Sequence, residues 1–333
     1  MLDGFLLIFS LALILAGAEI FTNSVEWLGK KLNLGEGAVG SVFAAVGTAM
    51  PETLVPIIAI LSGGNGAGHD VGIGAILGAP FMLATLAMFV TGLAAIIKRK
   101  DNSPMRISLD VLKRDIRFFI LVYAVAIVAS FLPFFALKIA ISVFLVASYV
   151  FYVYRTLKKS IGQYDEEDSL GPLFFQRKKS NPHLAVVLLQ LAAALSIIIV
   201  GATVFVDSIE SVTLALGVPV LVLSLIITPI ATELPEKFNS IIWVSQGKDT
   251  LALGNISGAM VFQSSLIPVI GILLTEWKLE PIALFSAGLA LAAAIYLYTG
   301  LSAKRGLKPV HLLVCNLFYV FFLVAALSGL LPV

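Results

Sequence analysis

The stretch Gly47-Thr48-Ala49-Met50-Pro51-Glu52 lies inside an apolar run that extends from about Ala38 to Leu61. It recurs in altered form as Ala231-Thr232-Glu233-Leu234-Pro235-Glu236. A hydroxyl, a proline and a carboxylate are costly inside a lipid bilayer, because the bilayer core offers no water to hydrogen-bond them. A membrane-spanning chain is expected to keep such groups where they have a function, and two copies of the pattern argue against chance.

The composition is typical of a polytopic membrane protein. Hydrophobic residues make up 59% of the 333 residues and charged residues 13%, and the mean hydropathy is +1.02. These values lie outside the usual range of soluble domains. The net charge is only +2, and we expect no nucleic-acid partner. The single cysteine, Cys315, cannot form an intramolecular disulfide, and we expect it to be buried.

Ten apolar stretches are long enough to cross a bilayer, which takes about 20 residues. The first is predicted to be a transmembrane helix rather than a signal peptide, because no basic segment precedes it. A polar loop at 157–183 divides the chain into two halves of five spans, residues 1–156 and 184–333. The predicted spans are 3–28, 37–62, 70–97, 116–132, 134–156, 184–214, 218–246, 250–275, 280–301 and 308–331.

The lysines and arginines predict an orientation. If the N-terminus is outside the cell, 19 of the 22 fall on the cytoplasmic side, Lys138 and Lys278 fall outside, and Lys237 lies within the membrane. Because positive charges favour the cytoplasmic side, the sequence predicts a multi-pass protein of the cell membrane. Both termini are expected to be extracytoplasmic, with the 157–183 loop in the cytoplasm.

The two halves repeat each other. A shift of 184 residues places Thr48, Pro51 and Glu52 on Thr232, Pro235 and Glu236, and the register holds without a gap for 36 residues. Each half has five spans, so the second must enter the membrane from the opposite side. The expected fold is an all-α polytopic membrane protein with ten transmembrane helices as two inverted five-helix repeats. Many secondary transporters have this architecture, with the substrate site near the membrane midplane.

The repeated motif offers oxygen ligands. Thr48 and Glu52 are spaced i, i+4 on one helical face, as are Thr232 and Glu236. A proline inside a helix also leaves the carbonyl four residues earlier without its N–H donor. Carbonyl, hydroxyl and carboxylate oxygens suit alkali and alkaline-earth cations, so we favour a cation site over kinked helices with structural glutamates. The freed carbonyls would be those of Gly47, Leu225 and Ala231.

At these motifs the chain resembles the cation/calcium exchanger superfamily, which includes the sodium/calcium exchangers. Each inverted repeat of that family carries Gly-Thr-Ser-Leu-Pro-Glu, followed on the next helix by Gly-Asn-x-x-Gly-Ser. The resemblance implies that Glu52 and Glu236 are the central calcium ligands and that Thr48 and Thr232 lend oxygens to calcium and sodium. It implies exchange of calcium, or another divalent cation, against sodium by alternating access, with the predicted first and sixth helices rearranging. The expected partners are small inorganic cations and membrane lipid, with no cofactor and the oligomeric state open.

The departures from the family pattern are as informative. Ala49 and Glu233 stand where the family has serine, and Leu83 stands where a polar ligand is expected. In the later stretch Asn255 is kept, and Gln263 replaces an acidic or amide ligand, so we retain Glu233, Asn255 and Gln263 as candidate ligands. Because several oxygens expected to hold sodium are missing, proton coupling remains an alternative.

Lys237 is not predicted by the family pattern. It follows Glu233 by one helical turn, which favours an ion pair between them. The sharper hypothesis is a tethered cation that occupies a sodium position in one state. A buried lysine can also lose its proton, which would link the cycle to protons.

Two other classes of function remain open at this point. Paired glutamates could serve an intramembrane hydrolase as acid and base, but no serine, histidine or cysteine lies near them as nucleophile or metal ligand. We therefore expect no enzyme. A non-transporting homologue, acting as a scaffold or sensor, is the third alternative.

Overall fold

The chain is all-helical over the residues that this computed structural model describes, which are 2–31, 50–62, 66–99, 103–160, 171–179, 181–245, 247–302 and 307–328. The π-helical turn Leu83–Ala87 joins two of the helices into one continuous column. The α-helices are α1 (Leu2–Lys31), α4 (Met50–Ser62), α5 (Ala67–Met82), α6 (Met88–Arg99), α7 (Leu109–Val128), α8 (Phe135–Ser160), α9 (Leu184–Leu216), α10 (Val220–Ser245), α11 (Asp249–Leu274), α12 (Pro281–Ser302) and α13 (Pro309–Leu327).

Seven stretches of the described chain are long and apolar enough to cross a membrane. They lie in α1, the α5–α6 column, α8, α9, α11, α12 and α13. The predicted spans 37–62, 116–132 and 218–246 do not meet that measure. Only 50–62 of the first is described, α7 is charged over its first turns, and the apolar part of α10 is limited to Val220–Ile230 because polar residues follow.

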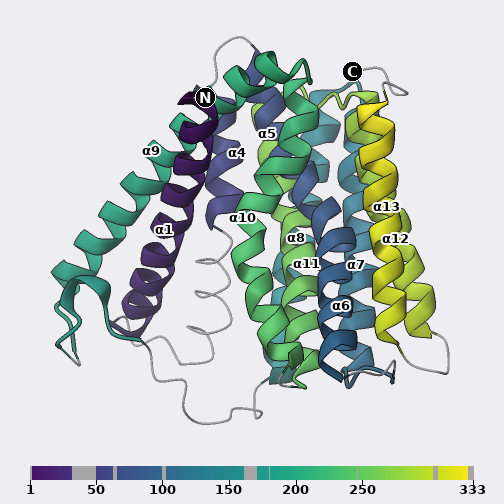
Figure 1. Ribbon diagram of the computed structural model, residues 1–333, viewed down its shortest axis with the longest axis horizontal. Coiled ribbons are helices and arrows are strands. Elements are labelled where there is room, and N and C mark those ends of the chain that lie inside the picture. The colour runs from purple at the N-terminus through teal and green to yellow at the C-terminus, as the bar shows by residue number, and fades with distance from the viewer. Residues whose placement is uncertain are drawn as a thin grey trace.

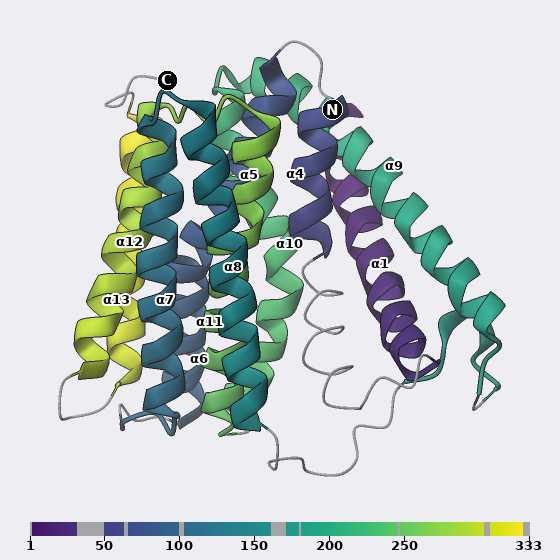
Figure 2. The ribbon, with the colours of Figure 1, turned by 180° about the vertical axis from the view of Figure 1, so that it is seen from behind.

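The helices form a bundle with α1 and α9 at one edge (Figures 1 and 2). These two helices lie side by side and run in opposite directions, with α4 between them and the rest of the bundle. The α5–α6 column is the most buried of the seven stretches. Ile76, Leu77 and Phe81 of α5 are fully buried and belong to the main hydrophobic core. The central helix of the bundle is therefore α5.

The contact between α1 and α9 is close and reciprocal. A Cβ atom added to Gly17 would lie 2.7 Å from Cγ1 of Ile198, and one added to Gly201 would lie 3.0 Å from Cγ1 of Ile14. The two glycines therefore let each helix approach the other. The shift of 184 residues exchanges the two contacts, since it carries Ile14 onto Ile198 and Gly17 onto Gly201.

Part of the 157–183 loop packs on α1 and α9. Trp27 Nε1 donates a hydrogen bond of 2.9 Å to the carbonyl of Gly171, and the backbone N–H of Phe175 donates to Gln190 Oε1 at 2.8 Å. Gln190 is fully buried, and its Nε2 donates to Ser24 Oγ at 2.9 Å. This end of the loop is thus tied to the helix pair, while its acidic run at 165–168 lies outside the described residues.

Candidate cation site

Glu52 lies in the first described turn of α4 and is buried. Its side chain is 5% exposed, and both carboxylate oxygens are inaccessible to solvent. A carboxylate at such burial is costly unless other groups compensate it. The predicted ligand of the first motif therefore points into the protein rather than toward lipid.

Glu233 of α10 and Gln263 of α11 contact each other. Glu233 is fully buried and Gln263 is 2% exposed. Gln263 Nε2 donates a hydrogen bond to Glu233 Oε1. Because the amide nitrogen faces the carboxylate, Gln263 Oε1 remains an acceptor, and it is buried without a hydrogen-bond partner among the described residues. Two candidates identified separately in the sequence thus form one polar cluster.

A row of hydroxyls on α10 leads to Thr232. Ser224, Thr228 and Thr232 are spaced by four residues, so they lie along one face of the helix, and all three are buried. Thr232 Oγ1 donates to the carbonyl of Thr228 at 3.1 Å. The hydroxyls of Ser224 and Thr228 have no hydrogen-bond partner within the described part of the chain. The sequence reasoning missed these two oxygens, although the spacing from Thr232 would have identified them.

The same part of α10 packs tightly on α5. A Cβ atom added to Gly74 would lie 2.5 Å from Cβ of Ser224, and one added to Gly78 would lie 2.5 Å from the carbonyl oxygen of Leu225. Leu225 O is the carbonyl that Pro229 leaves without its helical donor. The structure therefore covers this carbonyl with the backbone of α5.

The other predicted residues are less fully placed. Asn255 is partly buried on α11 and precedes Gln263 by eight residues, so the two lie about 12 Å apart along the helix. Thr48 lies outside the described residues. Glu236 and Lys237 belong to α10, but their side chains are outside the description, so the predicted pair of Lys237 with Glu233 stays a prediction. Within the described ranges, no three or more His, Cys, Asp or Glu side chains gather closely enough to hold a metal ion.

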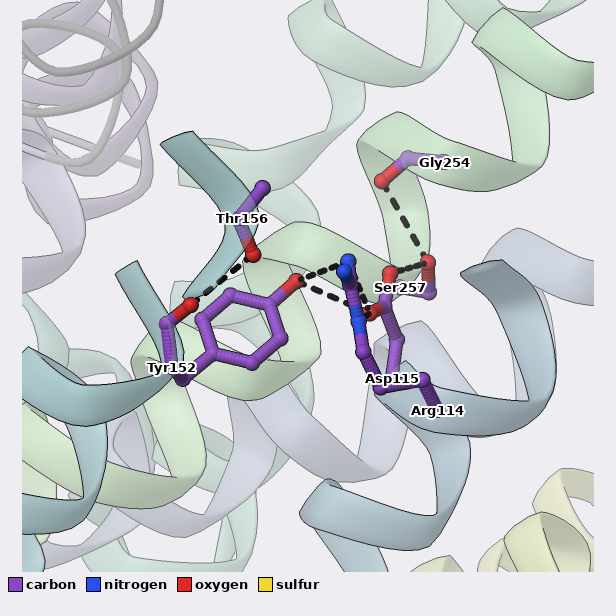
Figure 3. A network of polar contacts seen from close by, with 6 residues as sticks. All are labelled: Arg114, Asp115, Tyr152, Thr156, Gly254 and Ser257. Carbon is purple, nitrogen blue, oxygen red and sulfur yellow. Dashed lines mark hydrogen bonds and ion pairs between the residues drawn. The ribbon is translucent and has the colours of Figure 1, made fainter. Parts of the chain in front are cut away.

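A second polar cluster, centred on Asp115, was not predicted (Figure 3). Asp115 of α7 is 2% exposed. Its Oδ1 accepts from Tyr152 Oη at 2.9 Å and pairs with Arg114 Nη2 at 2.9 Å, and its Oδ2 accepts from Ser257 Oγ at 2.9 Å. Ser257 belongs to the Gly254–Ala259 stretch of α11, so the cluster fixes that stretch against α7 and α8.

The comparisons with known proteins agree with this geometry. A family model described as sodium/calcium exchanger protein matches residues 3–158 and 186–328. The inner membrane protein YrbG of Escherichia coli (strain K12) is 26% identical, over 84% of this chain and 82% of its own length. The sodium/calcium exchanger MaX1 of Methanosarcina acetivorans is 25% identical, over 96% of this chain and 97% of its own.

Two solved structures share the fold. The H⁺/Ca²⁺ exchanger CAX matches with a TM-score of 0.73 at 16% identity, covering 98% of this chain and 82% of that protein. The sodium-calcium exchanger NCX_Mj matches with a TM-score of 0.56 at 21% identity, covering 98% of both. The family match spans both halves of the chain, and the named exchangers among its relatives are transporters rather than enzymes. The chain therefore belongs to the sodium/calcium exchanger protein family.

Proposed function

We propose that this protein is a secondary active transporter that exchanges calcium, or another divalent cation, against sodium by alternating access. The observation that carries the proposal is the contact between Glu233 and Gln263, because it joins a buried carboxylate to a free amide oxygen between two helices of the bundle. Oxygen atoms of these types are the ligands that hard cations prefer. Glu52, buried on α4, supplies the carboxylate of the opposite half.

The proposed ligands are Glu52 and Glu236 as central carboxylates, with Thr48 and Thr232 lending hydroxyls. Glu233, Gln263 and Asn255 complete the set on α10 and α11. The fully ionised glutamates Glu52, Glu233 and Glu236 together with Lys237 would carry a net charge of −2, which balances one divalent cation. Lys237 would act as a tethered cation, or as a group that links transport to protons.

The proposed topology is ten spans in two inverted repeats, residues 1–156 and 184–333, joined by the 157–183 loop. The exchange of the Gly17 and Gly201 contacts under one shift supports it, as does the antiparallel course of α1 and α9. The start of α1 and the end of α13 lie at the same end of the bundle, as an even number of spans requires. The helix ends and starts that carry most of the basic residues lie at the other end (Figure 1), which supports a cytoplasmic loop and termini outside the cell membrane.

Proton coupling is the second candidate, and Leu83 favours it. Leu83 lies in the π-helical turn after α5, is fully buried, and belongs to the hydrophobic core. It occupies a position where the family resemblance places a polar ligand. An apolar side chain there removes an oxygen from sodium and leaves the glutamates as the groups that can exchange protons.

Radiolabelled calcium uptake into vesicles that contain the purified full chain tests the proposal. An outward sodium gradient and an outward proton gradient are imposed in turn. Uptake that depends on sodium supports the first candidate, and uptake that depends only on protons supports the second. No uptake of calcium or any other divalent cation under either gradient would contradict exchange and favour a non-transporting homologue.

A further inference from the structure

A basic pocket lies at the end of the bundle where α7 begins and α8 and α12 end. Its volume is about 440 Å³. Four cationic side chains line it, against the single carboxylate of Asp110. The cationic residues are Lys113, Arg114, Arg117 and Arg155.

Most of this positive charge has no carboxylate partner. Arg114 pairs with Asp115, and Arg155 lies over the ring of Phe151 at 5.6 Å. Lys113 and Arg117 make no ion pair with any other described residue, although Asp110 lines the same pocket. A bound anion would therefore meet at least two cations that nothing else in the described chain neutralises.

The rest of the pocket is apolar and open to the surroundings of the helices. Leu121 is 57% exposed and Phe151 is 60% exposed, and both line the pocket. Leu121 follows Arg114 by seven residues, which places it about 10 Å deeper along α7. The pocket thus has a charged end and an apolar end, separated by two helical turns.

We propose that this pocket binds an anionic phospholipid. Its phosphate would lie among Arg114, Arg117 and Arg155, and its acyl chain would cover Leu121 and Phe151. Basic pockets between membrane helices recognise the head groups of anionic lipids in this way. Arginine suits the task because its planar fork of donors matches the oxygens of a phosphate group.

The pocket shares two residues with the Asp115 cluster. Arg114 and Tyr152 line the pocket and also bind Asp115, which in turn accepts from Ser257 of α11 (Figure 3). A phosphate bound to Arg114 competes with Asp115 for the same guanidinium. Occupancy of the pocket therefore alters the contact that holds the Gly254–Ala259 stretch, and its effect on transport rests on the proposed function.

Lipid binding is measured first, because it does not depend on transport. Native mass spectrometry of the detergent-purified full chain is run with phosphatidylglycerol, with phosphatidylcholine and with inorganic phosphate as competitor. The wild type is expected to retain phosphatidylglycerol in preference to phosphatidylcholine, and inorganic phosphate at the same concentration should not displace it. The double variant Arg117→Gln/Arg155→Gln should weaken retention on the order of tenfold. Both side chains are exposed, and an unchanged melting temperature of the purified variant verifies the fold.

The matched control is the double variant Lys98→Gln/Lys178→Gln, which removes two exposed charges outside the pocket. It should retain phosphatidylglycerol as the wild type does. Equal weakening in both double variants, or equal retention of phosphatidylcholine, would overturn the proposed lipid site. Displacement by inorganic phosphate would reassign the pocket to the free ion.

The connection to α11 is tested in vesicles with and without phosphatidylglycerol. Calcium uptake by the wild type is expected to change with this lipid, and uptake by Arg117→Gln/Arg155→Gln is expected not to. Intact uptake that ignores the lipid in both proteins would overturn the connection. If no uptake occurs at all, the proposed function fails, while the binding measurement still decides the lipid site.

Discussion

The helices α5 and α11 match each other in the two halves of the chain, yet their glycines have different surroundings. Gly74 and Gly78 of α5 lie so close to α10 that an added Cβ atom would come within 2.5 Å of Ser224 or of the Leu225 carbonyl. For the matching Gly254 and Gly258 of α11, no atom of the described residues lies within 4 Å of such a Cβ. The same residue type therefore serves close helix packing in one half, and the sequence match alone does not carry that role to the other.

The polar groups are also divided unequally. The described part of the second half holds Glu233, Gln263 and the hydroxyl row of α10, whereas that of the first half contributes Glu52. Leu83, in the continuation of α5, is apolar and buried. The first half thus supplies a packing surface around one carboxylate, and the second half supplies most of the polar atoms.

The largest effect is expected from the pair Gly78→Ala and Gly258→Ala. The first change places a methyl group against the Leu225 carbonyl and Pro229, and we expect it to lower the free energy of unfolding by about 3 kcal/mol. The second should stay within about 1 kcal/mol of the wild type, because alanine favours a helix over glycine. Denaturation of the detergent-purified proteins, followed by tryptophan fluorescence, measures both. Equal losses would remove the proposed difference between the halves.

The next effect concerns the cluster of the second half. Gln263→Leu removes the donor to Glu233 and a buried acceptor oxygen, so we expect divalent-cation affinity to fall on the order of 10- to 100-fold. Ser264→Ala is the control, because this neighbouring buried hydroxyl bonds only to Val261 of its own helix. Equilibrium binding of radiolabelled calcium to the purified protein reports both, and an affinity unchanged in Gln263→Leu would exclude Gln263 from the site.

Lys237 distinguishes the halves by charge. We expect Lys237→Ala to change the ratio of sodium-driven to proton-driven calcium uptake, or the pH dependence of uptake, because it removes the one cation predicted within the membrane. Lys248→Ala, in the exposed turn before α11, serves as the control. If both variants keep the coupling and the pH profile of the wild type, Lys237 has no part in the mechanism.

The smallest effect is expected at Thr228. Replacing it with valine keeps the shape and removes a buried hydroxyl that lacks a hydrogen-bond partner among the described residues. Stability should be unchanged or higher by up to about 1 kcal/mol. If the hydroxyl binds the transported ion, affinity falls about two- to tenfold, and Thr228→Ser restores it. A stability loss without any change in affinity would make Thr228 a structural residue instead.

Much of the fold follows from local patterns in the sequence. Apolar runs predicted the long helices, and the 184-residue register brought together the residues that meet between α1 and α9. Gln263 and Glu233 could each be identified because each stands at a ligand position of a known motif. The hydroxyls of Ser224 and Thr228 were within reach of the same reasoning, because helical spacing connects them to Thr232.

The remaining features depend on contacts between distant segments. Asp115 lies among topogenic charges in the sequence, and nothing nearby reveals that Tyr152 and Ser257 bind it. The packing of the 171–176 segment on Trp27 and Gln190 likewise joins residues far apart in the chain. Such partners are set by the tertiary arrangement of helices, which periodicity and composition do not encode.

Calcium uptake by Glu52→Gln tests the central claim most directly. The change keeps the size of the side chain and removes the buried negative charge of the first half, while Glu276→Gln removes an exposed carboxylate in the loop before α12. The variants are compared in vesicles under whichever gradient drives the wild type. A cation site built on Glu52 predicts that uptake falls about 100-fold or more in Glu52→Gln and stays at the wild-type rate in Glu276→Gln. Wild-type uptake in Glu52→Gln would contradict it.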